Sequence, residues 1–152
     1  MLRDMDFKIE LSVRGIWKDM EVIFQELVQE NKEIGKAKAR LLHDQGKKNL
    51  AAKREIGRMV EKALQAKKKA ETEKIVATFK RTAGDYKLNP FLGVEMLMNA
   101  AFLVDKGREK EFDNLMDDLS EENKDRIKFI YAGPLPVFNF VNLTIYPEEW
   151  EK

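Results

Sequence analysis

Two segments alternate between apolar and polar positions, and we predict that both are β-strands. In residues 7–13, FKIELSV, every odd position is apolar and every even position is polar. Residues 126–132, RIKFIYA, alternate in a similar way. A two-residue period with one apolar face is typical of a strand half buried against a core. The nearly continuous apolar run at 93–105 instead predicts a central strand, and Asp85–Pro90 predicts a short edge strand.

Apolar residues recur every three or four positions in three further segments, which predict amphipathic helices at about 17–31, 47–82 and 108–122. At 1.5 Å per residue the second helix would be roughly 50 Å long. A compact domain of this size needs only a shorter helix. Part of this helix is therefore expected to project from the domain or to pair with residues 17–45 as a helical hairpin. Gly57 and the weakly apolar stretch 65–74 are the expected points of a kink, and Gly84 is expected to end the helix.

The order of these elements predicts an α+β fold of the ferredoxin-like βαββαβ type, an antiparallel sheet with helices on one face. It would carry an enlarged helical section, as a long helix or a helical hairpin, and an extended C-terminal tail. We expect one domain over 1–146 and a short tail over 147–152. The prolines of Gly133–Pro136 are expected to interrupt the strand ladder, since each removes a donor. Residues 137–146, VFNFVNLTIY, should then resume an extended conformation.

Composition excludes several classes of protein. The chain has 152 residues, 43% hydrophobic and 36% charged, and no cysteine, so disulfides and thiolate metal sites are excluded. The start, MLRDMDFKIE, lacks the pattern of a signal peptide. No stretch approaches the roughly 18 apolar residues of a membrane span. We therefore expect a cytoplasmic protein.

Charge is unevenly distributed along the chain. Residues 47–81 hold twelve Lys or Arg and four Glu, a local balance of +8, whereas 105–125 holds nine acids and four bases, a balance of −5. The two segments could face each other, face partners of opposite sign, or simply be solvated helix faces, which we favour. The triple Lys67–Lys69 is the strongest nucleic-acid signal. RNA binding by 47–81 is thus the alternative function, although KFIYAG lacks the aromatic RNA-binding motif found on this fold.

Candidates for catalysis are few. His43, the only histidine, lies in a polar helical stretch and is expected to be exposed. The adjacent acids Asp117–Asp118 and Glu121–Glu122 point in different directions on a helix, so they are interpreted as solvated surface. No GxxxxGK[ST] phosphate loop is present. The sequence therefore predicts a non-enzymatic protein without metal or cofactor that acts by binding another protein.

The C-terminal segment YAGPLPVFNFVNLTIYPEEW is unusually apolar and β-prone. Exposed to water, such a segment would promote aggregation. It must therefore fold back to complete the core, form an apolar patch for a partner, or do both.

Residues 95–143 resemble the C-terminal region of the gas vesicle accessory proteins GvpF and GvpL. Residues 99–105, NAAFLVD, match a strand motif of that family. An acidic amphipathic helix follows, and then a strand that ends in a Gly-Pro-Trp-Pro-Pro-Tyr-x-Phe-Val signature. The residues of this chain that fall on the signature are Gly133, Pro134, Pro136, Asn139, Phe140 and Val141. The chain departs from it at Leu135, Val137 and Phe138. Upstream, FKIELSVRGIW and GKKNLAAKREIGRMVEKAL resemble further family segments.

The resemblance implies a short family member or an excised C-terminal half, since relatives usually carry a further N-terminal domain. It also implies an accessory role in gas vesicle formation, in which the chain binds the small hydrophobic shell protein GvpA. The protein would prevent GvpA from aggregating or deliver it to the growing vesicle. The residues expected to bind the partner are Gly133, Pro134, Leu135, Pro136, Phe138, Phe140 and Val141.

Overall fold

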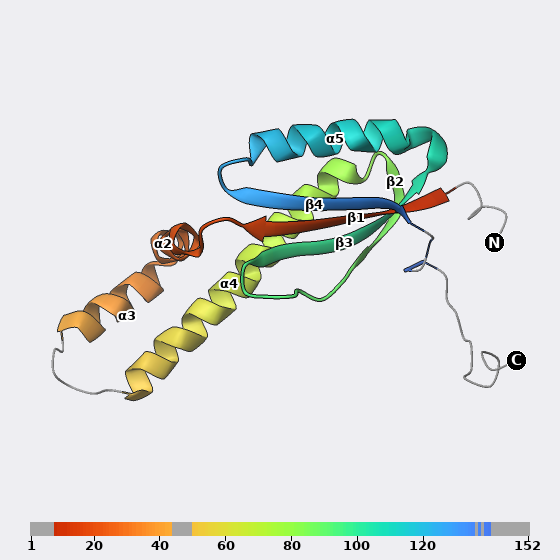
Figure 1. Cartoon of the computed structure of the whole chain (residues 1–152). Helices are drawn as coiled ribbons and strands as arrows, with labels where there is room; N and C mark the ends of the chain where they lie inside the picture. The colour runs from red at the N-terminus through yellow and green to blue at the C-terminus, as the bar shows by residue number, and fades with distance from the viewer. Residues whose placement is uncertain (1–7, 44–49, 136, 138, 141–152) are drawn as a thin grey trace, which may run out of the picture.

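The computed structural model describes residues 8–43, 50–135, 137, 139 and 140, which form a four-stranded antiparallel sheet with helices packed on one face (Figure 1). The strand order is β2-β3-β1-β4. This is the order of the predicted ferredoxin-like βαββαβ pattern, so the fold prediction is confirmed. The elements are β1 (Lys8–Trp17), α2 (Met20–Glu30), α3 (Lys32–His43), α4 (Leu50–Phe79), β2 (Ala83–Leu88), β3 (Met96–Asp105), η1 (Lys106–Arg108), α5 (Glu109–Glu122) and β4 (Ile127–Leu135).

β1 and β3 are the two central strands, as their apolar patterns predict. Leu11 of β1 lies opposite Phe102 of β3, and both side chains point into the helix-covered core. β3 is buried along its first nine residues, whereas β2 is an exposed edge strand. β1 is longer than predicted and continues to Trp17, so α2 begins only at Met20, where Asp19 caps it.

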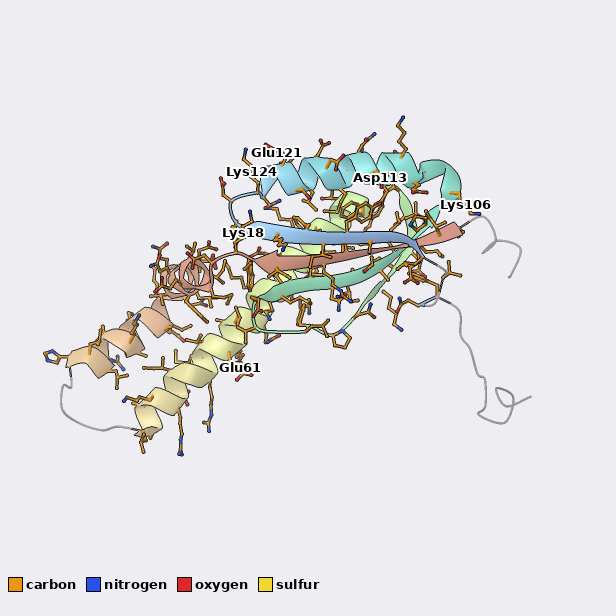
Figure 2. All side chains as sticks on the ribbon, viewed as in Figure 1. Lys18, Glu61, Lys106, Asp113, Glu121 and Lys124 are labelled. Carbon is orange, nitrogen blue, oxygen red and sulfur yellow. The ribbon has the colours of Figure 1, made fainter. Side chains whose placement is uncertain are left out.

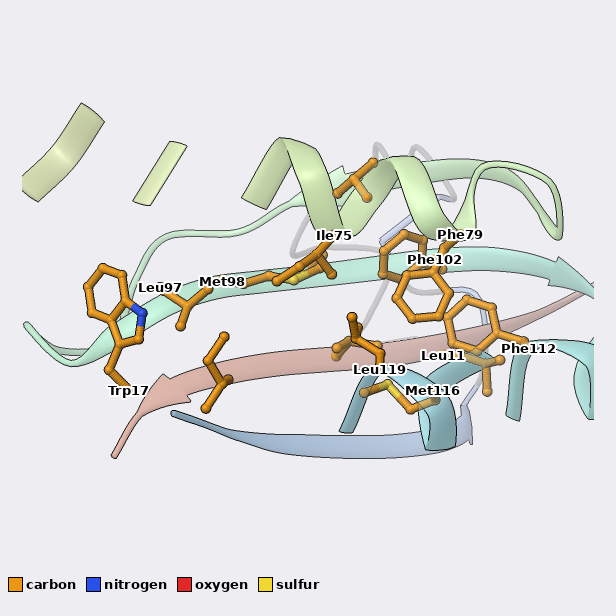
Figure 3. Close-up of a cluster of buried hydrophobic side chains, with 14 of the residues drawn as sticks. Leu11, Trp17, Ile75, Phe79, Leu97, Met98, Phe102, Phe112, Met116 and Leu119 are labelled. Atoms are coloured by element: carbon orange, nitrogen blue, oxygen red, sulfur yellow. The ribbon is translucent and has the colours of Figure 1, made fainter. Parts of the chain in front are cut away.

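An aromatic cluster joins the two layers of the core (Figure 3). Phe79 of α4 stacks on Phe112 of α5 with ring centroids 4.4 Å apart. Phe102 of β3 lies against both, at 5.2 and 5.3 Å. Aromatic pairs at such distances stabilise a core beyond the area that they bury. The C-terminal turn of α4 and the N-terminal turn of α5 are therefore fixed to the same part of the sheet.

α4 is one uninterrupted helix of 30 residues, so the predicted kink at Gly57 or within 65–74 is wrong. The weakly apolar stretch is held by polar contacts that hydrophobic periodicity does not reveal. Thr72, buried on the sheet side, donates a hydrogen bond to the Leu97 carbonyl at 2.7 Å. The N-terminal part of α4 runs beside α3 and extends beyond the sheet as a hairpin-like arm (Figure 1). The structure thus combines a long helix with a helical hairpin.

Two boundaries differ from the sequence-based expectation. α4 ends at Phe79, and Gly84 lies inside β2 instead of ending the helix. β4 continues to Leu135, which pairs with Glu10, but Gly133 and Pro134 have no partner on β1, so the ladder is interrupted there as expected and then resumes. A register shift on β1 between Glu10 and Ser12 accommodates the proline. The expected extended stretch 137–146 and the tail 147–152 lie almost wholly outside the described residues.

Candidate functional site

The structure describes four of the seven residues expected to bind the partner. Gly133, Pro134 and Leu135 form the end of β4, and Phe140 lies half-buried in the turn that follows. In that turn the Phe140 amide donates a hydrogen bond to the Val137 carbonyl at 3.2 Å. The other three, Pro136, Phe138 and Val141, lie outside the described residues. The described members are therefore brought together at one corner of the sheet.

Gly133 is required at its position by both conformation and space. Its φ is +136°, a backbone angle that residues with a Cβ rarely adopt. A Cβ there would lie 2.8 Å from Leu11 Cδ2 and 2.9 Å from the Glu10 carbonyl oxygen. The following Gly133–Pro134 peptide bond is cis. The close approach of the two backbones at Gly133 therefore lets β4 continue along β1 past the register shift.

Glu10 and Asn139 form a hydrogen-bonded pair that holds the C-terminal turn on the sheet. The Asn139 amide nitrogen donates to Glu10 Oε1 at 2.9 Å, and the Asn139 side-chain Nδ2 donates to Oε2 at 2.6 Å. Glu10 is only 3% exposed and points away from the helices, because its neighbours Ile9 and Leu11 point toward them. The second face of the sheet is thus covered at this point by residues near 139.

Sequence analysis did not find this pair, because the alternation of 7–13 places Glu10 on a polar face. Asn139 falls on the unspecified position of the family signature, so the signature gave no signal for its side chain either. A buried carboxylate with both oxygens hydrogen-bonded is satisfied without a cation. The turn therefore has a defined position, which a purely apolar segment would lack.

β4, the outer strand on this side of the sheet, carries two exposed apolar side chains, one in its middle and one at its end. Ile130 is 40% exposed and Leu135 is 39% exposed. β4 pairs only with β1, so its other edge is a free strand edge within the described chain. An exposed edge with apolar side chains can accept a further strand from a partner. Pro134 lacks an amide hydrogen, so such pairing would be interrupted there.

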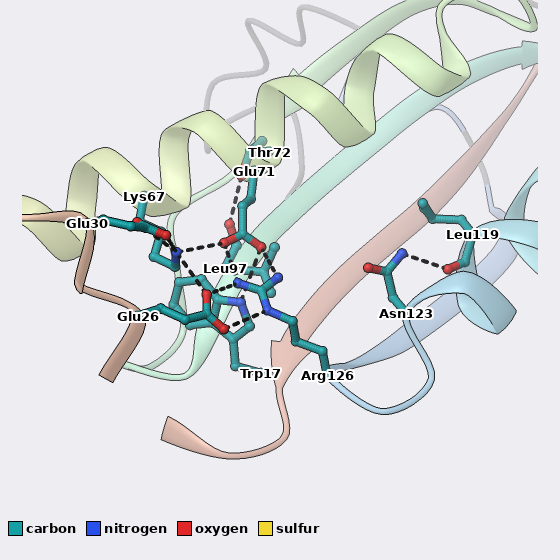
Figure 4. A network of polar contacts seen from close by, with 10 residues as sticks. All are labelled: Trp17, Glu26, Glu30, Lys67, Glu71, Thr72, Leu97, Leu119, Asn123 and Arg126. Carbon is teal, nitrogen blue, oxygen red and sulfur yellow. Dashed lines mark hydrogen bonds and ion pairs between the residues drawn. The ribbon is translucent and has the colours of Figure 1, made fainter. Parts of the chain in front are cut away.

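A network of ion pairs joins the helices at the other end of the sheet (Figure 4). Arg126, which follows α5, forms paired hydrogen bonds with Glu26 of α2 and with Glu71 of α4, the shortest at 2.6 Å. Lys67 of α4 lies 3.0 Å from Glu26 and 2.8 Å from Glu30. Bidentate guanidinium–carboxylate pairs of this kind fix orientation as well as charge. The network therefore fixes α2 and α4 to the turn that leads from α5 into the start of β4.

The network also shifts the pKa values of its members. Hydrogen bonding to Arg126 lowers the pKa of Glu26, and burial opposes this only in part. Glu71 and Glu26 together raise the pKa of Arg126 although burial acts in the opposite direction. Burial acts to lower the pKa of Lys67, but the hydrogen bonds that its ammonium donates to Glu30 and Glu26 raise it overall. All these shifts favour the charged forms, as expected of a structural ion-pair network.

The triple lysine is not the phosphate-binding patch that its sequence suggests. Lys67 is engaged by the glutamates of the network, and Lys68 is buried beneath the ring of Phe91, 4.7 Å from its centroid. Only Lys69 of the three is exposed. Exposed bases of α4 that remain on the arm include Lys53, Arg54 and Arg58. This weakens the main sequence signal for RNA binding.

The basic and acidic segments do not neutralise each other across the fold. Within the described residues no ion pair joins a side chain of α4 to one of α5. The acids Asp117, Asp118, Glu121 and Glu122 are exposed on the outer face of α5, where Figure 2 shows Glu121 projecting from the helix. Their interpretation as solvated surface is confirmed.

The described residues contain no group of three or more His, Asp or Glu that could hold a metal ion. His43 is exposed at the end of α3, as expected. No helix in the described ranges is both long enough and apolar enough to cross a membrane. What the geometry offers is surfaces for binding another macromolecule.

Comparison with known proteins identifies the family. Two crystal structures share the fold: gas vesicle protein GvpF from Anabaena sp. PCC7120, with a TM-score of 0.79, and GvpF from Microcystis aeruginosa, with 0.74. Each is 18% identical in sequence, and the similarity covers 95% and 93% of this chain. It covers only 59% and 57% of those proteins, so the chain spans less than two thirds of their length.

No curated protein matches the sequence. The family described as gas vesicle synthesis protein GvpL/GvpF does match, over residues 1–142, which is nearly the whole chain. The two central strands, the long helix, the acidic helix and the Gly-Pro strand end all lie within this match. This chain therefore belongs to the gas vesicle synthesis protein GvpL/GvpF family.

Proposed function

We propose that this protein is a non-enzymatic accessory factor of gas vesicle formation, working in the cytoplasm and associated with the vesicles. It binds the small hydrophobic shell protein GvpA and prevents its aggregation or delivers it to the growing vesicle. Family membership supports the gas vesicle role. The absence of a metal-binding cluster from the described residues is compatible with a binding function.

The single observation that carries the proposal is the free edge of β4. Its exposed apolar side chains are Ile130 in the middle of the strand and Leu135, which lies next to a turn that the Glu10–Asn139 pair fixes in place. A subunit that will line a gas space must expose apolar surface before it assembles, and a preformed apolar edge suits such a client. Because the edge is already ordered, less conformational entropy is lost on binding.

The proposed contact surface comprises the β4 end and the residues that follow it: Gly133, Pro134, Leu135, Pro136, Phe138, Phe140 and Val141. Aromatic side chains commonly act as anchors at such interfaces. We expect Phe138→Ala or Phe140→Ala to weaken binding to GvpA at least about tenfold, which corresponds to roughly 1.4 kcal/mol. Leu135→Ala should have a smaller effect in the same direction.

The test is a pull-down with purified GvpA beside a thermal melt of each variant. Leu88→Ala is the matched control, because Leu88 is an exposed leucine on the opposite edge strand, β2. It should leave binding unchanged. If Phe138→Ala and Phe140→Ala both bind normally while either loses its fold, the segment is part of the core and the proposed surface is wrong.

A further inference from the structure

A groove on the helical side of the molecule lies well away from the β4 end. It encloses about 630 Å³ between α4, α2 and the loop that joins β2 to β3. Phe24 of α2 and Phe91 and Val94 of the loop form its apolar walls, and each of them is more than a third exposed. The floor is one stripe of α4 that runs from Gly57 to Lys68. Exposed apolar surface of this kind marks a binding site.

The shape of the groove fits a helix better than a strand. Its floor follows the three- and four-residue spacing of α4 over eleven positions, about 16 Å along the axis. The backbone of α4 is hydrogen-bonded within the helix, so the floor offers no free donors or acceptors to an extended chain. An occupant must satisfy its own backbone groups, as an amphipathic helix does.

Gly57 leaves one end of the groove open. A Cβ added there would meet nothing within 4 Å, so no neighbour inside the chain requires a glycine. Glycine in a helix interior lowers stability relative to alanine. What it provides is bare backbone, against which another helix can pack closely, as small residues allow in helix pairs.

Lys68 places a buried positive charge at the other end. It is only 2% exposed, and its ammonium donates one hydrogen bond, to the Gly93 carbonyl at 3.3 Å, beneath the ring of Phe91. In the described part of the chain no carboxylate lies within ion-pair distance of it. Burial lowers the pKa of Lys68, and the charge of Glu95 offsets this in part. A buried ammonium with one hydrogen bond and no ion pair in the described residues is stabilised by the approach of an anion.

We propose that this groove binds an amphipathic helix of a partner protein that carries a carboxylate on its apolar face, and that Lys68 pairs with this carboxylate. The apolar stripe of the partner packs on Val60 and Leu64, and its backbone approaches Gly57. Glu61, on the rim of the groove and visible in Figure 2, lies about two helical turns from Lys68. The partner carboxylate that pairs with Lys68 is therefore kept apart from the like charge of Glu61. This interface is independent of the β4 end and of the identity of the shell protein.

The test uses synthetic 18-residue helical peptides labelled with fluorescein and followed by fluorescence anisotropy. One peptide has a leucine stripe with a central glutamate, and a matched peptide has glutamine in its place. We expect the glutamate peptide to bind at least about tenfold more tightly, as for a buried charge pair. Lys68→Met should abolish this preference, and Gly57→Met should weaken both peptides.

Lys69→Met is the matched control, since it makes the same change on an exposed position of α4 outside the groove. It should bind as the wild type does, and thermal melts check that every variant is folded. Equal binding of the two peptides, an unchanged preference in Lys68→Met, or no binding of the glutamate peptide would overturn the proposal. The proposal would also be overturned if the wild-type chain forms a dimer and Gly57→Met dissociates it, because the occupant of the groove would then be a second copy of the chain.

Discussion

Two glycines of this chain are used in opposite ways. Gly133 has a φ of +136° and backbone atoms packed against the place of its missing Cβ, whereas Gly57 lies in a helix with open space beside it. We expect Gly133→Ala to destabilise the protein by more than about 1 kcal/mol, because both strain and a clash with β1 must be relieved. Gly57→Ala should stabilise it by about 1 kcal/mol. Urea denaturation of both variants checks the prediction, and a loss of stability in Gly57→Ala would contradict it.

The Glu10–Asn139 pair makes a second residue-scale prediction. Asn139→Ala removes the side-chain donor to Glu10 Oε2 and leaves only the backbone N–H of residue 139 on Oε1, which should cost about 1–3 kcal/mol of unfolding free energy. In the double variant Glu10→Ala with Asn139→Ala, the loss should be smaller than the sum of the single losses. A double-mutant cycle measures this coupling. Additive losses would show that the pair does not stabilise the turn.

At the scale of elements, the ion-pair network makes the attachment of α2 and α4 depend on pH. The folded state lowers the pKa of Glu26 below its ordinary value of 4.5, chiefly through Arg126. The unfolded chain therefore takes up this proton more readily. The contribution of Glu26 to stability is complete above pH 4.5 and is lost as the pH falls through the folded-state pKa.

The matching experiment compares wild type with Glu26→Gln by urea denaturation at pH 7 and pH 3. The wild type should be the more stable at pH 7, and the difference should shrink at pH 3. Glu73→Gln serves as the control, because Glu73 is exposed on α4, the other helix that the network joins, and lies outside the network. A difference of equal size at both values of pH would show that Glu26 does not act through its charge.

The elements themselves could be predicted well, because each buries one continuous face. The alternation of β1, the apolar run of β3 and the spacing of α5 place Leu11, Phe102 and Phe112 in the core, where they are found. Polar residues were harder to place. The burial of Glu10 and of Lys68 depends on segments distant in sequence, residue 139 in one case and the loop at 91–93 in the other. Periodicity within one element contains no information about such partners.

At the scale of the whole molecule, the basic arm makes a prediction about nucleic acid. Since Lys67 and Lys68 are engaged within the fold, contacts with phosphates are left to exposed bases spread along α4, such as Lys53, Arg54 and Arg58. We expect weak, unselective binding of single-stranded RNA whose logarithmic salt dependence has a slope of about −0.7 per phosphate contacted. Fluorescence anisotropy at about 50 and 150 mM salt should show binding that disappears at the higher concentration. Tight binding at physiological salt would favour RNA over GvpA as the partner.

The position of β1 in the sequence has a consequence for the nascent chain during synthesis. Of the four strands of this sheet β1 is made first, yet its partners β3 and β4 come much later in the sequence, and Glu10 must wait for a residue 129 positions later. The helices between them have mostly local contacts and can form on the ribosome while the apolar face of β1 remains uncovered. The sheet can close only after β4 has been made. A protein proposed to protect an aggregation-prone subunit thus passes through an exposed stage of its own during synthesis.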